Sequence, residues 1–432
     1  MTSRPHPVVR TGVVRTGVVR TGADRLVADP TLVGGTRWGL VTNDTAVTAD
    51  LRLTSTALQD AGAPLVALFG PEHGLRGAAQ AGASDDLGLD EATGLPVYDT
   101  YLVADAALDA LLLASGIDTL LVDLPDIGVR YYTFVWTLVD CLRSAARVGI
   151  DVVVLDRPNP LGGLAVEGPD LDPAFASFVG RVPVPQRHGL TAGELALAVR
   201  ADDAAAGLPT GPVRVVELEG WTRDMLCAAT GLPWVMPSPN MPTPETALVY
   251  AGTGIVEGTT LSEGRGTTRP FEIVGAPWVD ARLAPALTAL GLPGVLFRPT
   301  TFTPTFHAFA GELVRGVQVH VSDPVAFEPV RTGVLLVETV ARLYPEDFGW
   351  RLPEPAEPAV QDGSSQDGSA GPGREGPSGT GAAGPSEVLP GRRPFVDLLW
   401  GSDALRTTVD AGVPVSTLLA PRSHRPDAVL LY

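Results

Sequence analysis

Acidic and basic side chains are concentrated in one short segment of the chain, EGTTLSEGRGTTRPFE at residues 257–272. Glycines, threonines and a proline separate three carboxylates and two guanidinium groups, those of Glu257, Glu263, Arg265, Arg269 and Glu272. This composition is unfavourable for a helix interior and offers little apolar surface to a core. The segment therefore predicts an ordered polar loop that presents acids and cations to a ligand.

Polar residues also follow short apolar segments that read as strands, at 37–42, 64–69, 118–124, 150–155 and 234–236. Directly after them come, in order, Asn43; Glu72, His73 and Arg76; Asp126, Arg130 and Tyr131; Asn159; and Asn240. The carboxyl ends of parallel strands meet at one edge, where open α/β folds bind ligands. One such loop alone would indicate only a turn, but five on one edge indicate a site.

Helical patterns alternate with these strands, at 49–61, 103–115, 133–148 and 191–201. Thr191 and Glu194 form a capping-box pattern at the start of the last one. Apolar strands alternating with helices predict an α/β fold with a parallel sheet covered on both faces.

The remainder of the chain predicts a second α/β region and two irregular segments. The second region has strand patterns at 294–298 and 314–321, and helical patterns at 326–343 and 394–409. Residues 353–391 are almost entirely Pro, Gly, Ala, Ser and acids, which predicts a disordered insertion. Residues 8–22 repeat VVRTG three times, so residues 1–22 are expected to form a flexible leader.

Composition excludes several classes of function. The net charge of −18 argues against nucleic acid and anionic membranes as partners. No apolar run approaches the roughly 20 residues of a membrane span, and no secretory signal is visible, so a cytoplasmic location is expected. With 45% apolar residues, the 432-residue chain is long enough for two domains.

Several catalytic chemistries lack their sequence signatures here. All 31 basic residues are arginine, which excludes a Schiff-base lysine, and no GxSxG or GxGxxG motif is present. The six histidines show no metal-ligand spacing, so neither a metal nor a cofactor is expected. Carboxylates, arginines, amides and tyrosines remain, the side chains of a glycosidase or of a protein that binds anionic sugars. Glycoside hydrolysis needs a carboxylic acid that protonates the leaving oxygen and a second group that acts as nucleophile or positions water, for which Glu72, Glu257 and Glu263 are candidates.

Long motifs in a fixed order resemble the DUF1343 family, which is associated with exo-β-N-acetylmuramidases of the NamZ type. The resemblance covers about residues 23–352 and 394–416. It is carried by LFGPEHGLRGAAQAG, VDLPDIGVRYYTF, VLDRPNPLGG, RHGLTAGELA, WVMPSPNMPT and YAGTGIVEGTTLSEGRGTTRPFEIVGAPW. It implies a Rossmann-like domain at 23–240, a smaller α/β domain at 241–432 and a cleft between them. The implied activity removes terminal N-acetylmuramic acid from the non-reducing end of peptidoglycan fragments.

This resemblance turns the polar loops into hypotheses about roles. Glu72 is expected to be the general acid/base and Glu263 the second carboxylate, with Glu257 and Asp126 as rivals. The lactyl carboxylate of the sugar suits Arg76, Arg130 and Arg265. Sugar hydroxyls or the acetamido group are assigned to Asn43, His73, Tyr131, Asn159 and Asn240.

Alternatives to this activity and mechanism are open from sequence alone. Retention, inversion and assistance by the 2-acetamido group are all compatible with the carboxylates. A hydrolase of another N-acetylated or acidic sugar would need the same side chains. So would a non-catalytic muropeptide-binding protein, which differs only in the absence of turnover.

Overall fold

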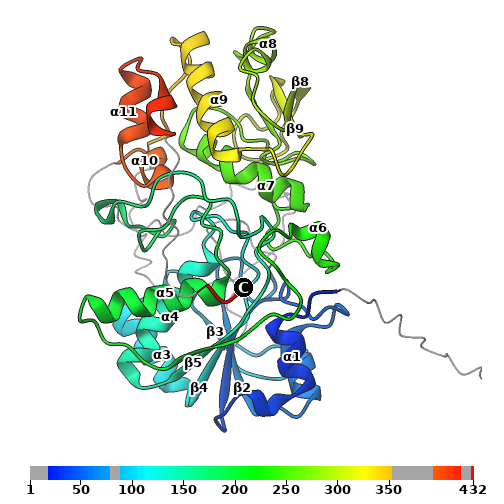
Figure 1. Ribbon diagram of the computed structural model, residues 1–432, viewed down its shortest axis with the longest axis vertical. Coiled ribbons are helices and arrows are strands. Elements are labelled where there is room, and N and C mark those ends of the chain that lie inside the picture. Colours follow the sequence, from blue (N-terminus) through cyan, green and yellow to red (C-terminus); the bar gives the residue numbers. More distant parts are fainter. Residues whose placement is uncertain (1–17, 78–87, 353–392, 420–429) are drawn as a thin grey trace, which may run out of the picture.

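The computed structural model describes residues 18–77, 88–352, 393–419 and 430–432. The insertion expected at 353–391 and the first two VVRTG repeats lie outside these described residues. The described part contains a six-stranded parallel sheet and a three-stranded antiparallel sheet (Figure 1). The predicted α/β class, with a parallel sheet and a smaller second unit, is confirmed.

The parallel sheet has the strand order β3-β2-β1-β4-β5-β6. Its strands are β1 (Trp38–Val41), β2 (Leu65–Gly70), β3 (Val97–Asp99), β4 (Thr119–Val122), β5 (Asp151–Leu155) and β6 (Val213–Val216). Every residue of β1 and β4 is buried, as expected for central strands with helices on both faces. The order reverses between β1 and β4, the arrangement of a Rossmann-like fold, which places a ligand crevice at the carboxyl edge.

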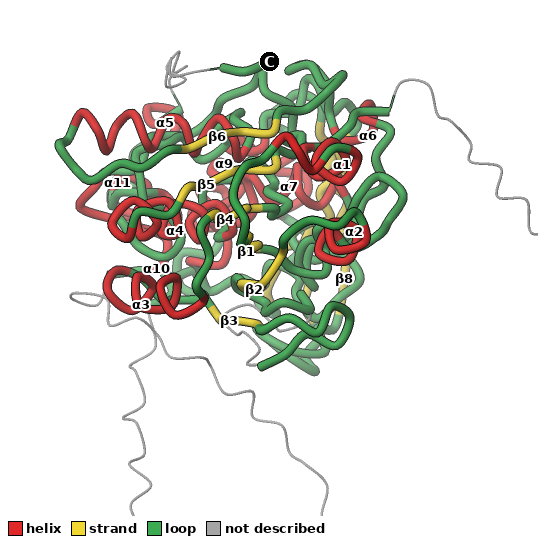
Figure 2. Tube along the Cα trace, turned by 90° about the horizontal axis from the view of Figure 1, so that it is seen from below, coloured by secondary structure: helices red, strands yellow, loops and turns green. Residues whose placement is uncertain are grey.

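Helices cover both faces of this sheet (Figure 2). On one face lie α1 (Gly22–Ala28) and α2 (Thr54–Asp60), and on the other lie α3 (Asp105–Ser115), α4 (Phe134–Val148) and α5 (Ala192–Ala205). The predicted capping box at Thr191 and Glu194 is present in both directions. The short elements are η1 (Pro30–Leu32), η2 (Pro173–Phe175) and α6 (Cys227–Thr230).

The second unit stacks above the carboxyl edge of the parallel sheet (Figure 1). Its antiparallel sheet, in the order β7-β9-β8, is formed by β7 (Ile273–Ala276), β8 (Val295–Phe302) and β9 (Val314–Val321). The helices are α7 (Pro244–Thr253), η3 (Gly254–Gly258), α8 (Leu283–Thr288), α9 (Pro329–Leu343), α10 (Phe395–Trp400), α11 (Ala404–Asp410) and η4 (Val415–Leu418). A Cβ on Gly252 would lie 1.8 Å from the Pro329 carbonyl oxygen, so glycine is required where α7 crosses α9.

Several elements of the structure differ from the sequence-based expectations. The strand expected at 234–236 is a loop, because Pro233 and Pro237 bracket it and cannot donate hydrogen bonds to a ladder. The edge strands β3, β6 and β7 were not predicted from the sequence. The helix expected at 394–409 is divided at Gly401, whose φ of +85° ends α10.

The third VVRTG repeat, at 18–22, is built into the parallel-sheet unit. Val19 is buried and its N–H donates to the Thr230 carbonyl at 2.9 Å, while Arg20 bridges to Glu219. Thr21 caps α1.

The last residues of the chain also return to the parallel sheet. The Tyr432 hydroxyl donates to Asp156 Oδ2 at 2.8 Å and accepts from the Leu218 N–H at 2.9 Å. Its ring packs edge-on against Trp221. Asp156 follows β5 and is fully buried, so residues 430–432 fix the end of that strand from a distance of more than 270 residues in sequence.

Asp156 should make the stability of the fold depend on pH. Burial raises its pKa to about 6, against opposing hydrogen bonds from the Gly193 N–H and the hydroxyls of Thr191 and Tyr432. The folded state therefore holds a proton that the unfolded state, with an aspartate pKa of about 3.9, has lost. The free energy of unfolding should fall by up to about 3 kcal/mol as the pH rises from about 4 to about 6.

Asp156→Asn isolates this contribution, because the two facing hydroxyls can accept from an amide as well as donate. In urea unfolding between pH 4 and pH 7, the free energy of unfolding should decrease less with rising pH in the variant than in the wild type. Equal slopes in both proteins would contradict the assignment to Asp156.

Candidate functional site

A cavity of about 250 Å³ lies between the carboxyl edge of the parallel sheet and the second unit. Loops after β2 and β4 form one wall, and α7, η3 and the segment after it form the other. The cavity is lined by Glu72, His73, Tyr101, Tyr131, Tyr132, Thr133, Phe178, Val179, Ser238, Asn240, Met241, Tyr250, Glu257, Arg265, Phe271, Phe395 and Leu399. Its aromatic side chains and its convergent polar groups are typical of a small-molecule site.

Glu72 comes from the turn that follows β2. Its side chain is buried, and the Thr133 hydroxyl, at the start of α4, donates to its Oε2. The next residue, His73, has a φ of +71° and packs its ring against Phe134. The turn thus places a carboxylate and an imidazole on the cavity wall, as the sequence predicted.

The two tyrosines after β4 have different surroundings. The Tyr131 hydroxyl donates to the carbonyls of Tyr250 and Ala251, at 3.0 and 2.6 Å, and so joins this loop to α7. The Tyr132 hydroxyl is buried and has no hydrogen-bond partner among the described residues. Burial raises the pKa of both phenols, which keeps them neutral. Tyr132, which the sequence-based assignment omitted, therefore retains a donor for a bound ligand.

The acidic segment brings a second carboxylate to the cavity, and it is Glu257. Arg265 Nη1 contacts Glu257 Oε1 and lies 3.2 Å from Glu263 Oε1. The guanidinium also lies over the Phe271 ring, 4.9 Å from its centroid. Burial raises the pKa of Glu257; the positive charge of Arg265 opposes this effect and the Glu263 carboxylate adds to it.

Glu263, the residue preferred from sequence, does not line the cavity. Its side chain is 1% exposed and lies behind Arg265, with His307 Nδ1 3.0 Å from its Oε1. Burial would raise its pKa, but the hydrogen bond from His307 and the charge of Arg265 lower it to about 2. Glu263 is therefore a buried anion that contacts the site through Arg265.

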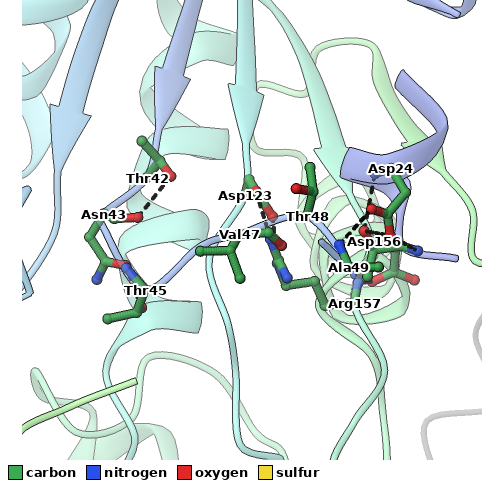
Figure 3. Close-up of polar contacts among 12 residues, drawn as sticks. Asp24, Thr42, Asn43, Thr45, Val47, Thr48, Ala49, Asp123, Asp156 and Arg157 are labelled. Atoms are coloured by element: carbon green, nitrogen blue, oxygen red, sulfur yellow. Dashed lines mark hydrogen bonds and ion pairs between the residues drawn. The ribbon is translucent and has the colours of Figure 1, made fainter. Parts of the chain in front are cut away.

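Two of the predicted amides hold loops rather than face the cavity. Asn43 Oδ1 accepts from the N–H and the hydroxyl of Thr45, at 3.1 and 2.5 Å (Figure 3). Asn159 donates to the Leu190 carbonyl and accepts from the Leu161 N–H, both at 2.9 Å. Asn240, by contrast, lines the cavity as predicted.

Of the three predicted arginines, only Arg265 lines the cavity. Arg130 is fully buried, and its Nη atoms donate to four backbone carbonyls, those of Pro169, Val184, Leu399 and Trp400. Arg76 is 44% exposed in its side chain and lies 3.5 Å from Glu91. The structure therefore brings neither Arg130 nor Arg76 to the cavity wall.

Asp126 lines a different cavity, of about 90 Å³, together with Thr45, Arg157 and Trp234. Its Oδ2 accepts from the Gly128 N–H at 2.8 Å and lies 3.4 Å from His188 Nε2. The structure does not place it with Glu72 on the wall of the larger cavity. Of the two rivals to Glu263, it is Glu257 that shares the larger cavity with Glu72.

An ion pair between Arg157 and Asp123 joins the loops of the parallel sheet (Figure 3). Arg157 donates to both carboxylate oxygens of Asp123, at 2.6 and 2.9 Å, and to the Val47 carbonyl at 2.9 Å. These groups follow β5, β4 and β1, so one guanidinium holds three neighbouring loops. Because the pair is buried, removal of either partner would leave an uncompensated charge.

No metal-binding cluster of three or more His, Cys, Asp or Glu side chains is found within the described ranges. Among the helices described, none has the length and apolar character needed to cross a membrane.

Comparisons with known proteins identify the family of this chain. The family model described as exo-beta-N-acetylmuramidase NamZ, N-terminal, matches residues 38–245, and its C-terminal counterpart matches 248–424. Peptidoglycan beta-N-acetylmuramidase NamZ of Bacillus subtilis (strain 168) is 46% identical over 318 residues, which are 73% of this chain and 75% of that protein.

Two crystal structures of DUF1343 family proteins from Bacteroides fragilis NCTC 9343 have the same fold. One has a TM-score of 0.75 and 32% identity, covering 93% of this chain and 94% of that one. The other has a TM-score of 0.66 and 25% identity, covering 93% of each chain. Since both family models match in order along a single chain, the protein belongs to the NamZ family of DUF1343 proteins.

Proposed function

We propose that this protein is an exo-β-N-acetylmuramidase that releases terminal N-acetylmuramic acid from the non-reducing end of peptidoglycan fragments. The observation that carries the proposal is the presence of two carboxylates, Glu72 and Glu257, on the walls of one cavity of about 250 Å³. Its support also includes the 46% identity to a relative named peptidoglycan beta-N-acetylmuramidase.

Glu72 is proposed as the general acid/base. The Thr133 hydroxyl donates to its Oε2, an arrangement in which the proton of the acid form is carried on Oε1. That proton would pass to the glycosidic oxygen as the bond breaks, and hydrolysis would return a proton from water.

Glu257 is proposed as the second carboxylate, in place of Glu263. Its contact with Arg265 favours the ionised form, which can act on the anomeric carbon, orient a water or orient the 2-acetamido group. The anomeric configuration of the first product, followed by NMR, separates inversion from the two retaining routes.

Arg265 is the guanidinium group on the cavity wall and is proposed to attract the lactyl carboxylate. Asn240, His73 and Tyr132 are proposed as partners for the hydroxyls and the acetamido group. The aromatic side chains Phe178 and Phe395, stacked with 6.2 Å between ring centroids, form an apolar part of the wall.

A panel of 4-nitrophenyl glycosides tests the proposed activity. The β-N-acetylmuramide should be hydrolysed, and the β-N-acetylglucosaminide, which lacks only the lactyl group, should be hydrolysed far more slowly. Faster hydrolysis of another glycoside would redirect the assignment to that sugar. Stabilisation by N-acetylmuramic acid in a thermal shift, without turnover of any glycoside, would indicate a binding protein instead.

Tyr132→Phe should raise KM about tenfold and leave the melting temperature near that of the wild type. The hydroxyl has no partner in the described structure, so its loss should be felt mainly when a ligand is bound. Tyr131→Phe is the matched control, because it removes hydrogen bonds to two carbonyls of α7. It should lower the melting temperature and affect KM less. The reverse pattern would contradict the proposed division of roles.

We also propose that the enzyme acts in the cytoplasm. Cys141 and Cys227 are both free thiols, as is usual for proteins of a reducing compartment. Cell fractionation with an antibody against the protein tests this location.

A further inference from the structure

A chain of charged groups runs from the β8–β9 connection to the wall of the cavity. His307 Nδ1 lies 3.0 Å from Glu263 Oε1, and Arg265 Nη1 lies 3.2 Å from the same oxygen. The same Nη1 contacts Glu257 Oε1. Basic and acidic side chains therefore alternate along His307, Glu263, Arg265 and Glu257, from a half-exposed imidazole to the candidate second carboxylate.

Backbone contacts fix the outer end of this chain against the acidic segment. The N–H and the hydroxyl of Thr305 both donate to the Gly266 carbonyl at 3.0 Å. Gly266 has a φ of +80°, and a Cβ there would lie 2.7 Å from the Phe306 carbonyl oxygen. The connection between β8 and β9 is thus docked on the turn that carries Arg265.

Glu263 has no direct access to a substrate. It is 1% exposed, absent from the cavity lining, and its Oε2 has no hydrogen-bond partner among the described residues. A buried carboxylate is costly unless neighbouring charges compensate it, and here His307 and Arg265 do so. It can therefore act on the site only through its contact with Arg265 and through its charge.

We propose that Glu263 and His307 are positioning residues, which hold Arg265, and through it Glu257, in place on the cavity wall. The inference rests on the proposed function, in which Glu257 is the second carboxylate. It assigns the β8–β9 connection, which contributes no residue to the cavity lining, a part in organising the site.

Because Glu263 and His307 carry charges of opposite sign, replacing each should have an opposite effect on the ionisation of Glu257. A loss of packing alone would not produce opposite effects. Besides its own burial, three charged side chains act on Glu257, those of Arg265, Glu263 and His307, and the phenols of Tyr131 and Tyr250 are its neutral titratable neighbours. The Glu263 charge raises the pKa of Glu257, and the His307 charge lowers it, so removal of each charge should have opposite consequences.

The pH profile of kcat/KM for the 4-nitrophenyl N-acetylmuramide measures this signature in the full-length protein. If ionised Glu257 is required, its ionisation sets the acidic limb. Glu263→Gln should move that limb to lower pH by about half a unit or more. His307→Asn, which keeps an N–H near the position of Nδ1 but loses the charge, should move it by a few tenths to higher pH.

Thr305→Val is the matched control, since it weakens the same docking contact without a change of charge. Its acidic limb should coincide with that of the wild type. Melting temperatures report on folding, and His307→Asn, at a half-exposed position, keeps the test decisive if Glu263→Gln unfolds.

The proposal would be overturned if the acidic limb of the kcat/KM profile stayed at the wild-type pH in both Glu263→Gln and His307→Asn, or if it moved in the same direction in both. That failure is distinct from failure of the proposed function, because the wild type itself would then show no turnover of the glycoside.

Discussion

Replacement of Glu72 by glutamine should lower kcat/KM by about 10²- to 10⁴-fold on a substrate whose leaving group is a sugar. A sugar alkoxide is a poor leaving group, so its departure depends on a proton from the enzyme. The same variant should lose much less on the 4-nitrophenyl glycoside, because 4-nitrophenolate leaves without protonation. The comparison needs only steady-state kinetics with the two substrates and a melting curve for each protein.

Glu257→Gln is expected to behave differently from Glu72→Gln. A carboxylate that acts at the anomeric centre is needed whatever the leaving group, so its loss should reduce kcat/KM by a similar large factor on both substrates. For each variant, the loss of kcat/KM on the sugar substrate is compared with the loss on the 4-nitrophenyl glycoside. This comparison distinguishes the general acid from the carboxylate that acts at the anomeric centre. The two assignments would be exchanged if Glu72→Gln reduced kcat/KM equally on both substrates and Glu257→Gln reduced it mainly on the substrate with the sugar leaving group.

Asp126→Asn is the control for a carboxylate outside the cavity. It keeps the shape of the side chain and an acceptor for the Gly128 N–H. Its kcat/KM should stay within a few-fold of the wild type on both substrates. A loss comparable to that of Glu72→Gln would return Asp126 to the catalytic candidates.

Near wild-type turnover by Glu72→Gln on both substrates would refute the role proposed for Glu72.

The parallel sheet and its ligand-binding edge were predictable from sequence because they depend on local pattern. Buried strands such as β1 and β4 are continuous apolar runs, and the polar loops after them share one edge by topology. Glu72, His73 and Tyr131 were identified in this way, and all three line the cavity. Asn240 also lines it, although the strand expected before it, at 234–236, is a loop. The edge strand β6 was missed because it is only four residues long and partly exposed.

The choice between the acids of 257–272 was not predictable from sequence, because side-chain direction in an irregular loop follows no period. Glu257 belongs to η3, which continues from α7 and therefore keeps its side chain at the cavity. Glu263 turns inward, where His307 from the β8–β9 connection meets it across 44 positions of sequence. Glu263 lies next to Arg265 in the structure, as its place in the sequence indicated. That proximity alone did not show which carboxylate faces the cavity.

The aromatic part of the cavity wall was missed for a related reason. Phe178 lies in an irregular segment and Phe395 begins α10, so neither stands in a motif of polar residues. They meet only because the second unit folds back over the first, with their rings stacked at an interplanar angle of 9°. Contacts between segments more than 200 residues apart leave no local signal in either segment.

Arg130 is the residue whose sequence-based role differs most from its surroundings, and its replacement should have the largest effect on stability. Its guanidinium donates at 2.7 Å to each of the Pro169, Val184 and Trp400 carbonyls and at 3.2 Å to the Leu399 carbonyl. Arg130→Met would leave the Pro169, Val184 and Trp400 carbonyls without a donor, whereas the Leu399 carbonyl would keep a long contact with Gln186 Nε2 at 3.4 Å. Because each unsatisfied group costs about 1–3 kcal/mol, the free energy of unfolding should fall by about 4 kcal/mol or more.

Arg130→Lys distinguishes this structural role from the binding of a substrate carboxylate. A lysine keeps the charge, but its single ammonium group cannot reproduce the planar fork that joins the 169–184 segment to the end of α10. Its melting temperature should lie between those of Arg130→Met and the wild type, with KM nearly unchanged in the folded fraction. If Arg130 bound the lactyl carboxylate instead, the lysine variant would show a raised KM at an unaltered melting temperature. The full burial of the guanidinium and its four carbonyl partners favour the first result, which would leave Arg265 as the cation that meets the substrate.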